Sequence, residues 1–125
     1  MVYNINMMKL TIKATNLDLT PEIKQALEEK IATLDRLLPG VKTPLEASIE
    51  VAVETRHHQK GEIYYAEANI KILGEVVRAE AREENIFKAI GVVKKELQGL
   101  LKKYKKKQIA RREKAARALK EKLEG

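Results

Sequence analysis

The sequence predicts an α+β domain in the order β-α-β-β-β-α, in which two helices cover one face of a four-stranded sheet. Three observations predict it. Apolar and polar residues alternate in four segments, which is typical of strands with one buried face. Two further segments carry apolar residues at helical spacing. The length of 125 residues suits one domain with a single core.

The first strand and the first helix have clear signals. Residues 8–15 alternate strictly, with Met8, Leu10, Ile12 and Ala14 on one side. Next, Thr20 suits a helix N-cap, Pro21 the first helical position and Glu22 the first turn. The apolar residues of this helix recur at helical spacing and stop before Pro39-Gly40: Ile23, Leu27, Ile31, Leu34 and Leu38.

Three more strands follow a similar pattern. Residues 45–54 alternate, then a polar loop surrounds His57-His58, and residues 64–72 alternate again. Gly74 turns the chain into residues 76–81, so the last two strands are expected to form an antiparallel hairpin. One sheet face is expected to lie in water, with these residues on it: Lys9, Thr11, Glu46, Glu50, Glu67, Lys71 and Glu80.

The second helix is expected to have an apolar side and a lysine side. The apolar stripe is Ile86, Ile90, Val93, Leu97, Leu100, Leu101 and Tyr104. Lys88, Lys95, Lys102 and Lys106 fall on the opposite side, interleaved with Gly91 and Gly99. After Tyr104 the stripe fails. We therefore expect a domain over residues 8–107 and a basic tail over residues 108–125, which either protrudes as a fraying helix or is ordered only by a partner.

The positive charge is concentrated in one segment. Residues 1–87 hold 11 Lys or Arg against 14 Asp or Glu, whereas residues 88–112 hold 10 against one. A segregated basic block on a mildly acidic body indicates a surface for a polyanion, with a solvated helix face as the alternative. Lysine ammonium groups suit phosphate oxygens better than base edges, so we expect weak sequence specificity and strong salt dependence.

Composition excludes several other classes of protein. The chain has no cysteine, hence neither a disulfide framework nor a thiolate metal site. No signal peptide or membrane-spanning run is evident, which predicts a cytoplasmic protein without membrane contact. The aromatic content of 4% disfavours a platform for base stacking.

Enzymatic chemistry finds little support. His57 or His58 could pair with Glu54 or Glu62 as a catalytic group, but a polar loop explains the same residues. No metal-ligand spacing, phosphate loop or nucleophile with its base is present. We predict no catalytic activity, no metal and no cofactor.

The two glycines of the second helix leave two interpretations open. Each costs about 1 kcal/mol relative to alanine in a helix interior. Gly91 and Gly99 would let a ribose-phosphate backbone approach the helix between the lysines, or they are drift without a role.

Several segments in this order resemble the ribosome hibernation-promoting factor and ribosome-associated inhibitor A family, in its short form. They are Lys9–Lys13, Leu19–Lys24, Tyr65–Ile70, Gly74–Glu80, Glu84–Ile90 and Lys103–Lys107. No single segment is specific, but their order and spacing are. Two residues depart from the family pattern: Gly91 replaces a usual aspartate and Phe87 a usual tyrosine.

The resemblance implies a bacterial, starvation- or cold-associated protein that occupies the decoding channel of the small ribosomal subunit. It would overlap transfer and messenger RNA and inhibit translation, with a fold similar to double-stranded RNA-binding domains. The implied ribosomal RNA contacts are Arg78, Arg82, Lys88, Lys94, Lys95, Lys102, Lys103, Lys105, Lys106 and Lys107. Weaker candidates are Lys24 and Lys30, together with Arg111 and Arg112 of the tail.

The implied partners are the small subunit and its RNA. The chain carries no long-form dimerisation domain, so self-driven ribosome dimerisation is not expected, and the protein is expected to be a monomer off the ribosome. Two alternatives stay open: it promotes ribosome dimers with a helper factor, or it prevents them with its tail. Two other functions compete with this one: a general double-stranded RNA-binding module, and a helical adaptor in which the tail docks a protein.

Overall fold

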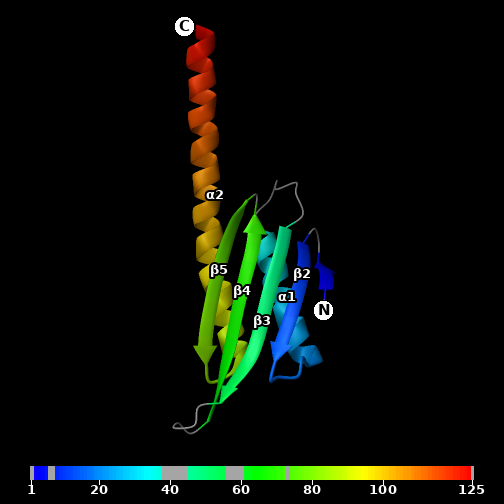
Figure 1. Cartoon of the computed structure of the whole chain (residues 1–125). Coiled ribbons are helices and arrows are strands. Elements are labelled where there is room, and N and C mark those ends of the chain that lie inside the picture. The colour runs from blue at the N-terminus through cyan, green and yellow to red at the C-terminus, as the bar shows by residue number, and fades with distance from the viewer. Residues whose placement is uncertain (1, 6–7, 38–44, 56–60, 73, 125) are drawn as a thin grey trace.

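The computed structural model describes residues 2–5, 8–37, 45–55, 61–72 and 74–124. Its elements, shown in Figure 1, are β1 (Val2–Ile5), β2 (Met8–Thr15), α1 (Pro21–Asp35), β3 (Leu45–Thr55), β4 (Glu62–Ile72), β5 (Glu75–Glu83) and α2 (Ile86–Glu124). From β2 onward the order is β-α-β-β-β-α, which confirms the predicted α+β fold. His57 and His58 lie outside the described residues, as do Leu38, Pro39 and Gly40.

The strands form one mixed sheet in the order β1-β2-β3-β4-β5. β2 and β3 are parallel and are joined through α1, while β3 with β4 and β4 with β5 are antiparallel. The predicted hairpin of the last two strands is confirmed. Its turn contains Gly74 at φ +85°, a left-handed conformation that favours glycine.

The sheet has one strand more than the sequence predicted. Residues Val2–Ile5 form β1, which pairs antiparallel with β2 at the sheet edge. Four residues are too few for alternation to stand out in the sequence, and such a strand is held by its pairing with β2. The additional strand extends the sheet on the side away from α2, as Figure 1 shows.

Both helices contribute to a single core on one face of the sheet. The N-cap of α1 is as predicted, because Thr20 Oγ1 accepts a hydrogen bond from the backbone N–H of Ile23 at 3.2 Å. The buried residues of α1 are Ile23, Leu27, Ile31 and Leu34, and those of α2 are Ile86, Ala89, Ile90, Val93, Leu97, Leu101 and Tyr104. They pack with Leu10, Ile12, Ala47, Ile49, Val51, Ala66, Ala68, Ile70, Ile72 and Ala79 of the sheet.

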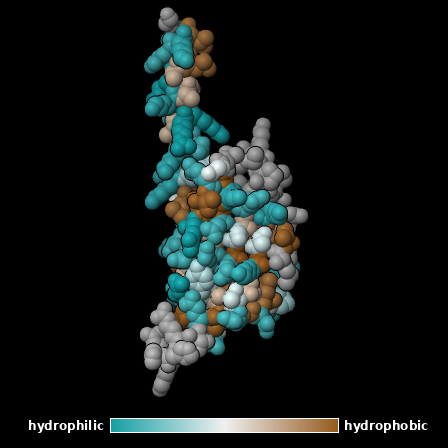
Figure 2. All heavy atoms as spheres, viewed as in Figure 1, coloured by the Kyte–Doolittle hydropathy of each residue, from teal (hydrophilic) through white to brown (hydrophobic). Residues whose placement is uncertain are grey.

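Tyr104 is the last buried residue of α2, which is where the apolar stripe predicted that packing would end. The helix then continues unbroken to Glu124, so residues 108–124 are helical. Residues 105–124 are exposed except for the half-buried Gln108. Figure 1 shows the end of α2 standing clear of the body beyond β5, and Figure 2 shows that most of its surface is hydrophilic. The domain boundary after residue 107 stays a prediction.

Candidate nucleic-acid interface

The lysines of α2 lie opposite its buried stripe. Lys88, Lys95, Lys102 and Lys106, which we call the lysine row, are all exposed. Because Ile90, Leu97 and Leu101 anchor the other side of the helix in the core, the row cannot turn inward without unpacking it. The neighbouring Lys103, Lys105 and Lys107 are exposed as well. The fold therefore presents a rigid basic surface about 27 Å long between residues 88 and 106, at 1.5 Å per residue.

Most of these charges are not neutralised within the molecule. Lys88 lies 3.8 Å from Glu83 and 3.4 Å from Glu84 at the start of α2. Within the described part of the chain, no ion pair joins Lys95, Lys102 or Lys106 to a carboxylate. Free ammonium groups on a fixed helix face can bind phosphate oxygens without first breaking an internal contact.

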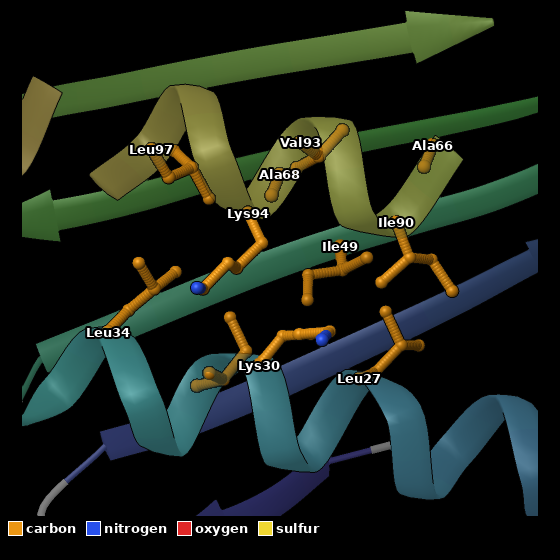
Figure 3. Close-up of a pocket in the computed structure, with 11 residues that line it drawn as sticks. Leu27, Lys30, Leu34, Ile49, Ala66, Ala68, Ile90, Val93, Lys94 and Leu97 are labelled. Atoms are coloured by element: carbon orange, nitrogen blue, oxygen red, sulfur yellow. The ribbon is translucent and has the colours of Figure 1, made fainter. Parts of the chain in front are cut away.

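A second basic position lies between the two helices. Figure 3 shows Lys30 of α1 and Lys94 of α2 extending into the space between α1 and α2, above Ile49 of the sheet. Both lysines are half-buried and line a shallow groove with an apolar floor. The groove is lined further by Leu27, Ile31, Leu34, Ala66, Ala68, Ile90, Val93 and Leu97. The structure thus brings Lys30 and Lys94 together across the groove, whereas Lys24 lies 3.7 Å from Glu28 on α1.

The structure does not place Arg78 and Arg82 on the lysine side of the molecule. Both project from β5 onto the sheet face opposite the helices, which we call the outer face, because Ala79 between them is buried in the core. Arg78 pairs with Glu67 at 3.4 Å and Glu80 at 3.3 Å. Arg82 pairs with Glu54 at 3.2 Å.

Tyr65 is the centre of this network on the outer face. Its hydroxyl lies between the carboxylates of Glu67 and Glu80, to one of which it donates at a time, and the guanidinium of Arg82 lies 4.7 Å from the centre of its ring. Burial and these carboxylates raise the pKa of Tyr65 above its ordinary value. The charge of Glu67 likewise raises the pKa of Arg78, and a hydrogen bond to Glu54 raises that of Arg82. Both arginines are therefore held in internal contacts.

The two arginines of the tail lie beyond Tyr104, the last buried residue of α2. Arg111 is 3.9 Å from Glu75 at the start of β5, so this pair sits where α2 leaves the sheet. Arg112 is exposed. Neither residue is part of the lysine row, which ends at Lys106.

Comparison with known proteins identifies the family. The model of the Sigma 54 modulation protein / S30EA ribosomal protein family matches residues 10–109. The chain belongs to this family.

Individual relatives agree with the family match. A ribosome hibernation promotion factor from Picosynechococcus is 28% identical over 105 residues, 84% of this chain and 53% of the relative. The chain thus spans about half the length of that curated relative. The crystal structure of the Protein Y N-terminal domain from Thermus thermophilus has a TM-score of 0.64 at 24% identity, covering 75% of this chain and 94% of the other. A ribosomal subunit interface protein from Coxiella burnetii has a TM-score of 0.61 at 20% identity, covering 77% and 96%. At these identities the two structures show a shared fold.

Two features of this family member were not foreseen from its sequence. One is the meeting of Lys30 with Lys94, which needs the packing of α1 beside α2. The other is Tyr65, which is 8% exposed although it faces outward. The pairing of Tyr65 with Arg82 on the neighbouring strand could have indicated that Tyr65 is covered. To find this pairing, however, the register of β4 and β5 must be known.

The described part of the chain contains no group of three or more His, Asp or Glu side chains placed to hold a metal ion. None of its helices is long and apolar enough to cross a membrane. The possible role of His57 and His58 stays untested.

Proposed function

We propose that this protein is a ribosome hibernation factor that binds the small ribosomal subunit through phosphates of ribosomal RNA. The observation that carries the proposal is the lysine row, a rigid line of charges on the far side of a helix that is anchored in the core. Among the described residues, its members Lys95, Lys102 and Lys106 form no ion pair with a carboxylate. Family membership and the name of the curated relative support the choice of the ribosome as the target.

The proposed contact is mainly with the RNA backbone. Lys88, Lys95 and Lys102 follow one another at seven-residue steps, about 10.5 Å along the helix axis. Each ammonium can approach a different phosphate, while the groove lysines Lys30 and Lys94 would hold a phosphate beside the row. Lys103, Lys105 and Lys107 would add charge at its end. Because bound phosphates release counterions, affinity should fall steeply with salt.

The proposed consequence is a block of translation. A body anchored in the decoding channel would occupy space that transfer RNA and messenger RNA need, so initiation would stop without any chemical step. This mechanism requires no catalytic residue, metal or cofactor, and it would operate in the cytoplasm, where ribosomes are. The protein is proposed to be a monomer before it binds.

The test is co-sedimentation with purified small subunits at low and high salt, together with inhibition of a cell-free translation system. The variant K95Q/K102Q/K106Q should remain folded, because the three side chains are exposed. It should bind small subunits at least about tenfold more weakly and lose inhibition, because three phosphate contacts are removed. The matched control K9Q/K13Q/K71Q removes three lysines from the outer face and should bind like the wild type. Absence of the wild-type protein from the subunit fraction at low salt contradicts the proposal.

The second candidate function is general recognition of double-stranded RNA, which the lysine row alone would also support. Binding to an unrelated RNA duplex separates the two. Equal affinity for the duplex and for small subunits would favour the general module, whereas a strong preference for subunits favours the hibernation factor.

A further inference from the structure

The last part of α2 carries an apolar stripe that the body does not use. Residues 105–124, which we call the extension, span about 30 Å at 1.5 Å per residue. Arg111 still lies 3.9 Å from Glu75 of β5, so about 20 Å of the extension lies beyond this contact with the body. None of the residues of the extension is buried. Most helices in proteins are stabilised by packing an apolar face, so an isolated helix of this length gains little from its own surroundings.

The stripe has the spacing of a helix that packs against another surface. Positions 109, 112, 116, 119 and 123 follow one another at steps of three and four residues. Ile109, Ala116, Leu119 and Leu123, which we call the extension stripe, occupy four of them. Ile109 is 45%, Leu119 59% and Leu123 79% exposed. Figure 2 shows hydrophobic residues gathered on one side of α2 near its end.

The stripe is not a continuation of the core stripe. Steps of three and four from Leu101 and Tyr104 lead to Gln108 and Arg111, and Arg111 pairs with Glu75 of β5. The extension stripe starts at Ile109, which is displaced around the helix from that line. It also lacks the cations that an RNA backbone would contact, apart from Arg112. The extension stripe therefore needs a separate explanation from both the core and the lysine row.

The charged residues around the extension stripe indicate what kind of partner it fits. Residues 108–124 hold six Lys or Arg against three Glu. Arg112 lies within the stripe line. Lys120 and Lys122 lie beside it together with Glu113 and Glu124, of which Glu124 is 3.9 Å from Lys120, whereas Glu121 falls on the opposite side of the helix. A second copy of this chain would bring like charges together and set Arg112 against apolar residues. RNA offers leucines no apolar surface to bury, and three large apolar residues without an aromatic are few for a membrane-surface helix.

We propose that the extension stripe docks as a single helix into an apolar groove rimmed by carboxylates on a protein component of the ribosome. Leu119 and Leu123 would fill the groove, the small Ala116 would allow close approach, and Arg112 would pair with a carboxylate at the rim. The location of the partner rests on the proposed function. The lysine row would hold the body on RNA, and the extension would reach a protein up to about 20 Å beyond the contact between Arg111 and Glu75.

The experiment compares binding of the full chain to small subunits, to large subunits and to protein-free RNA extracted from each. The variant L119Q/L123Q keeps the helix propensity of leucine and removes the apolar contact. Its control, A110Q/A118Q, places the same side chain on the side of the extension away from the stripe. We expect L119Q/L123Q to bind subunits at least about tenfold more weakly. It should keep the wild-type salt dependence and the wild-type affinity for protein-free RNA, and the control should resemble the wild type throughout.

Several outcomes overturn the inference. An equal loss on protein-free RNA would mean that the stripe contacts RNA, and unchanged affinity for both subunits would mean that it docks on neither. Concentration-dependent dimers that L119Q/L123Q abolishes would make a second copy the occupant. Binding to vesicles of anionic phospholipid that the variant abolishes would assign the stripe to a membrane. If the wild type binds no subunit, the proposed function itself fails. If the wild type binds and L119Q/L123Q binds equally well, the proposed function stands and only the docking of the extension stripe is wrong.

A photo-crosslinking amino acid at position 119 provides a second readout. On subunits it should yield a protein adduct whose crosslinked segment is rich in Asp and Glu, whereas the same group at position 118 should not. An adduct to RNA, or to a basic protein segment, contradicts the proposed chemistry of the groove.

Discussion

Arg78 Nε lies 3.4 Å from Oε1 of Glu67 on the neighbouring strand. The same guanidinium reaches Glu80, so the charge of Arg78 is balanced on the outer face before any partner arrives. Arg82 has an equivalent contact with Glu54. An arginine in such a pair must give up its carboxylate to bind a phosphate, and this reduces the net gain.

We therefore predict that R78Q/R82Q weakens small-subunit binding less than K95Q/K102Q, although each variant loses two positive charges. Exposed ion pairs contribute little to stability, so R78Q/R82Q should unfold only slightly more readily than the wild type. Co-sedimentation and thermal unfolding measure the two effects. An equal or greater loss of binding in R78Q/R82Q would place RNA on the outer face, as the family resemblance implies.

The second prediction concerns the acid side of the stability profile. Hydrogen bonds from Tyr65 and Asn69, together with the charge of Arg78, hold the pKa of Glu67 below its ordinary value of 4.5. A carboxylate with a depressed folded pKa stabilises the protein above its unfolded pKa, and this contribution is lost as pH falls through the folded pKa. The difference in Tm between the wild type and E67Q should be largest above about pH 5 and vanish at lower pH.

Thermal unfolding between pH 3 and pH 7 tests this expectation, with E46Q as a control that removes one exposed carboxylate from the same sheet face. A Tm difference for E67Q that stays constant, or grows, as the solution is acidified would show that the Tyr65 network does not stabilise the ionised form.

The sequence predicted the parts of the fold that depend on local periodicity. The alternation of residues 8–15 and the helical spacing from Ile86 to Tyr104 reflect burial on one side, so β2 and α2 were predicted with their buried faces. Two predicted members of these faces are not buried, because Ala14 is exposed near the end of β2 and Leu100 is half-buried at the border of the α2 stripe. The side of α2 that carries the lysine row follows from the same spacing. β1 was not predicted, because a four-residue edge strand is stabilised by pairing with its neighbour and its own sequence is too short to show a pattern.

The candidate site was predictable only along one element. Lys95 and Lys102 share a helix face by sequence alone, whereas Lys30 and Lys94 meet because α1 packs beside α2. Arg78 was assigned to the RNA-facing set from the family resemblance. Its contact with Glu67 depends on the register of β4 and β5, which one sequence does not specify.

The third prediction concerns the glycines of α2. A methyl group at Gly91 or Gly99 would meet no atom within 4 Å apart from its chain neighbours and the nearby backbone of the same helix, and neither residue has a positive φ. G91A and G99A should each raise the unfolding free energy by about 0.5–1 kcal/mol, as alanine does in a helix interior. G74A is the matched control, and it should lower stability because Gly74 has a φ of +85°.

Binding of the same variants to small subunits decides between the two interpretations of these glycines. Weaker binding by a more stable G91A/G99A protein would mean that RNA approaches the helix at these positions. Unchanged binding would leave them without a role in the interface. A lower Tm for either single variant would contradict the open surroundings that the structure shows.

The fourth prediction tests the domain boundary after residue 107. Deleting residues 108–125 removes no buried residue among those described, and the ion pair between Arg111 and Glu75, at 3.9 Å, contributes less than about 1 kcal/mol. The shortened protein should therefore unfold within a few degrees of the full chain. L101A in the full chain should instead lose about 2–5 kcal/mol, because Leu101 is 1% exposed in the core. A shortened protein as unstable as L101A would make the extension part of the folding unit, and the boundary would then lie beyond residue 107.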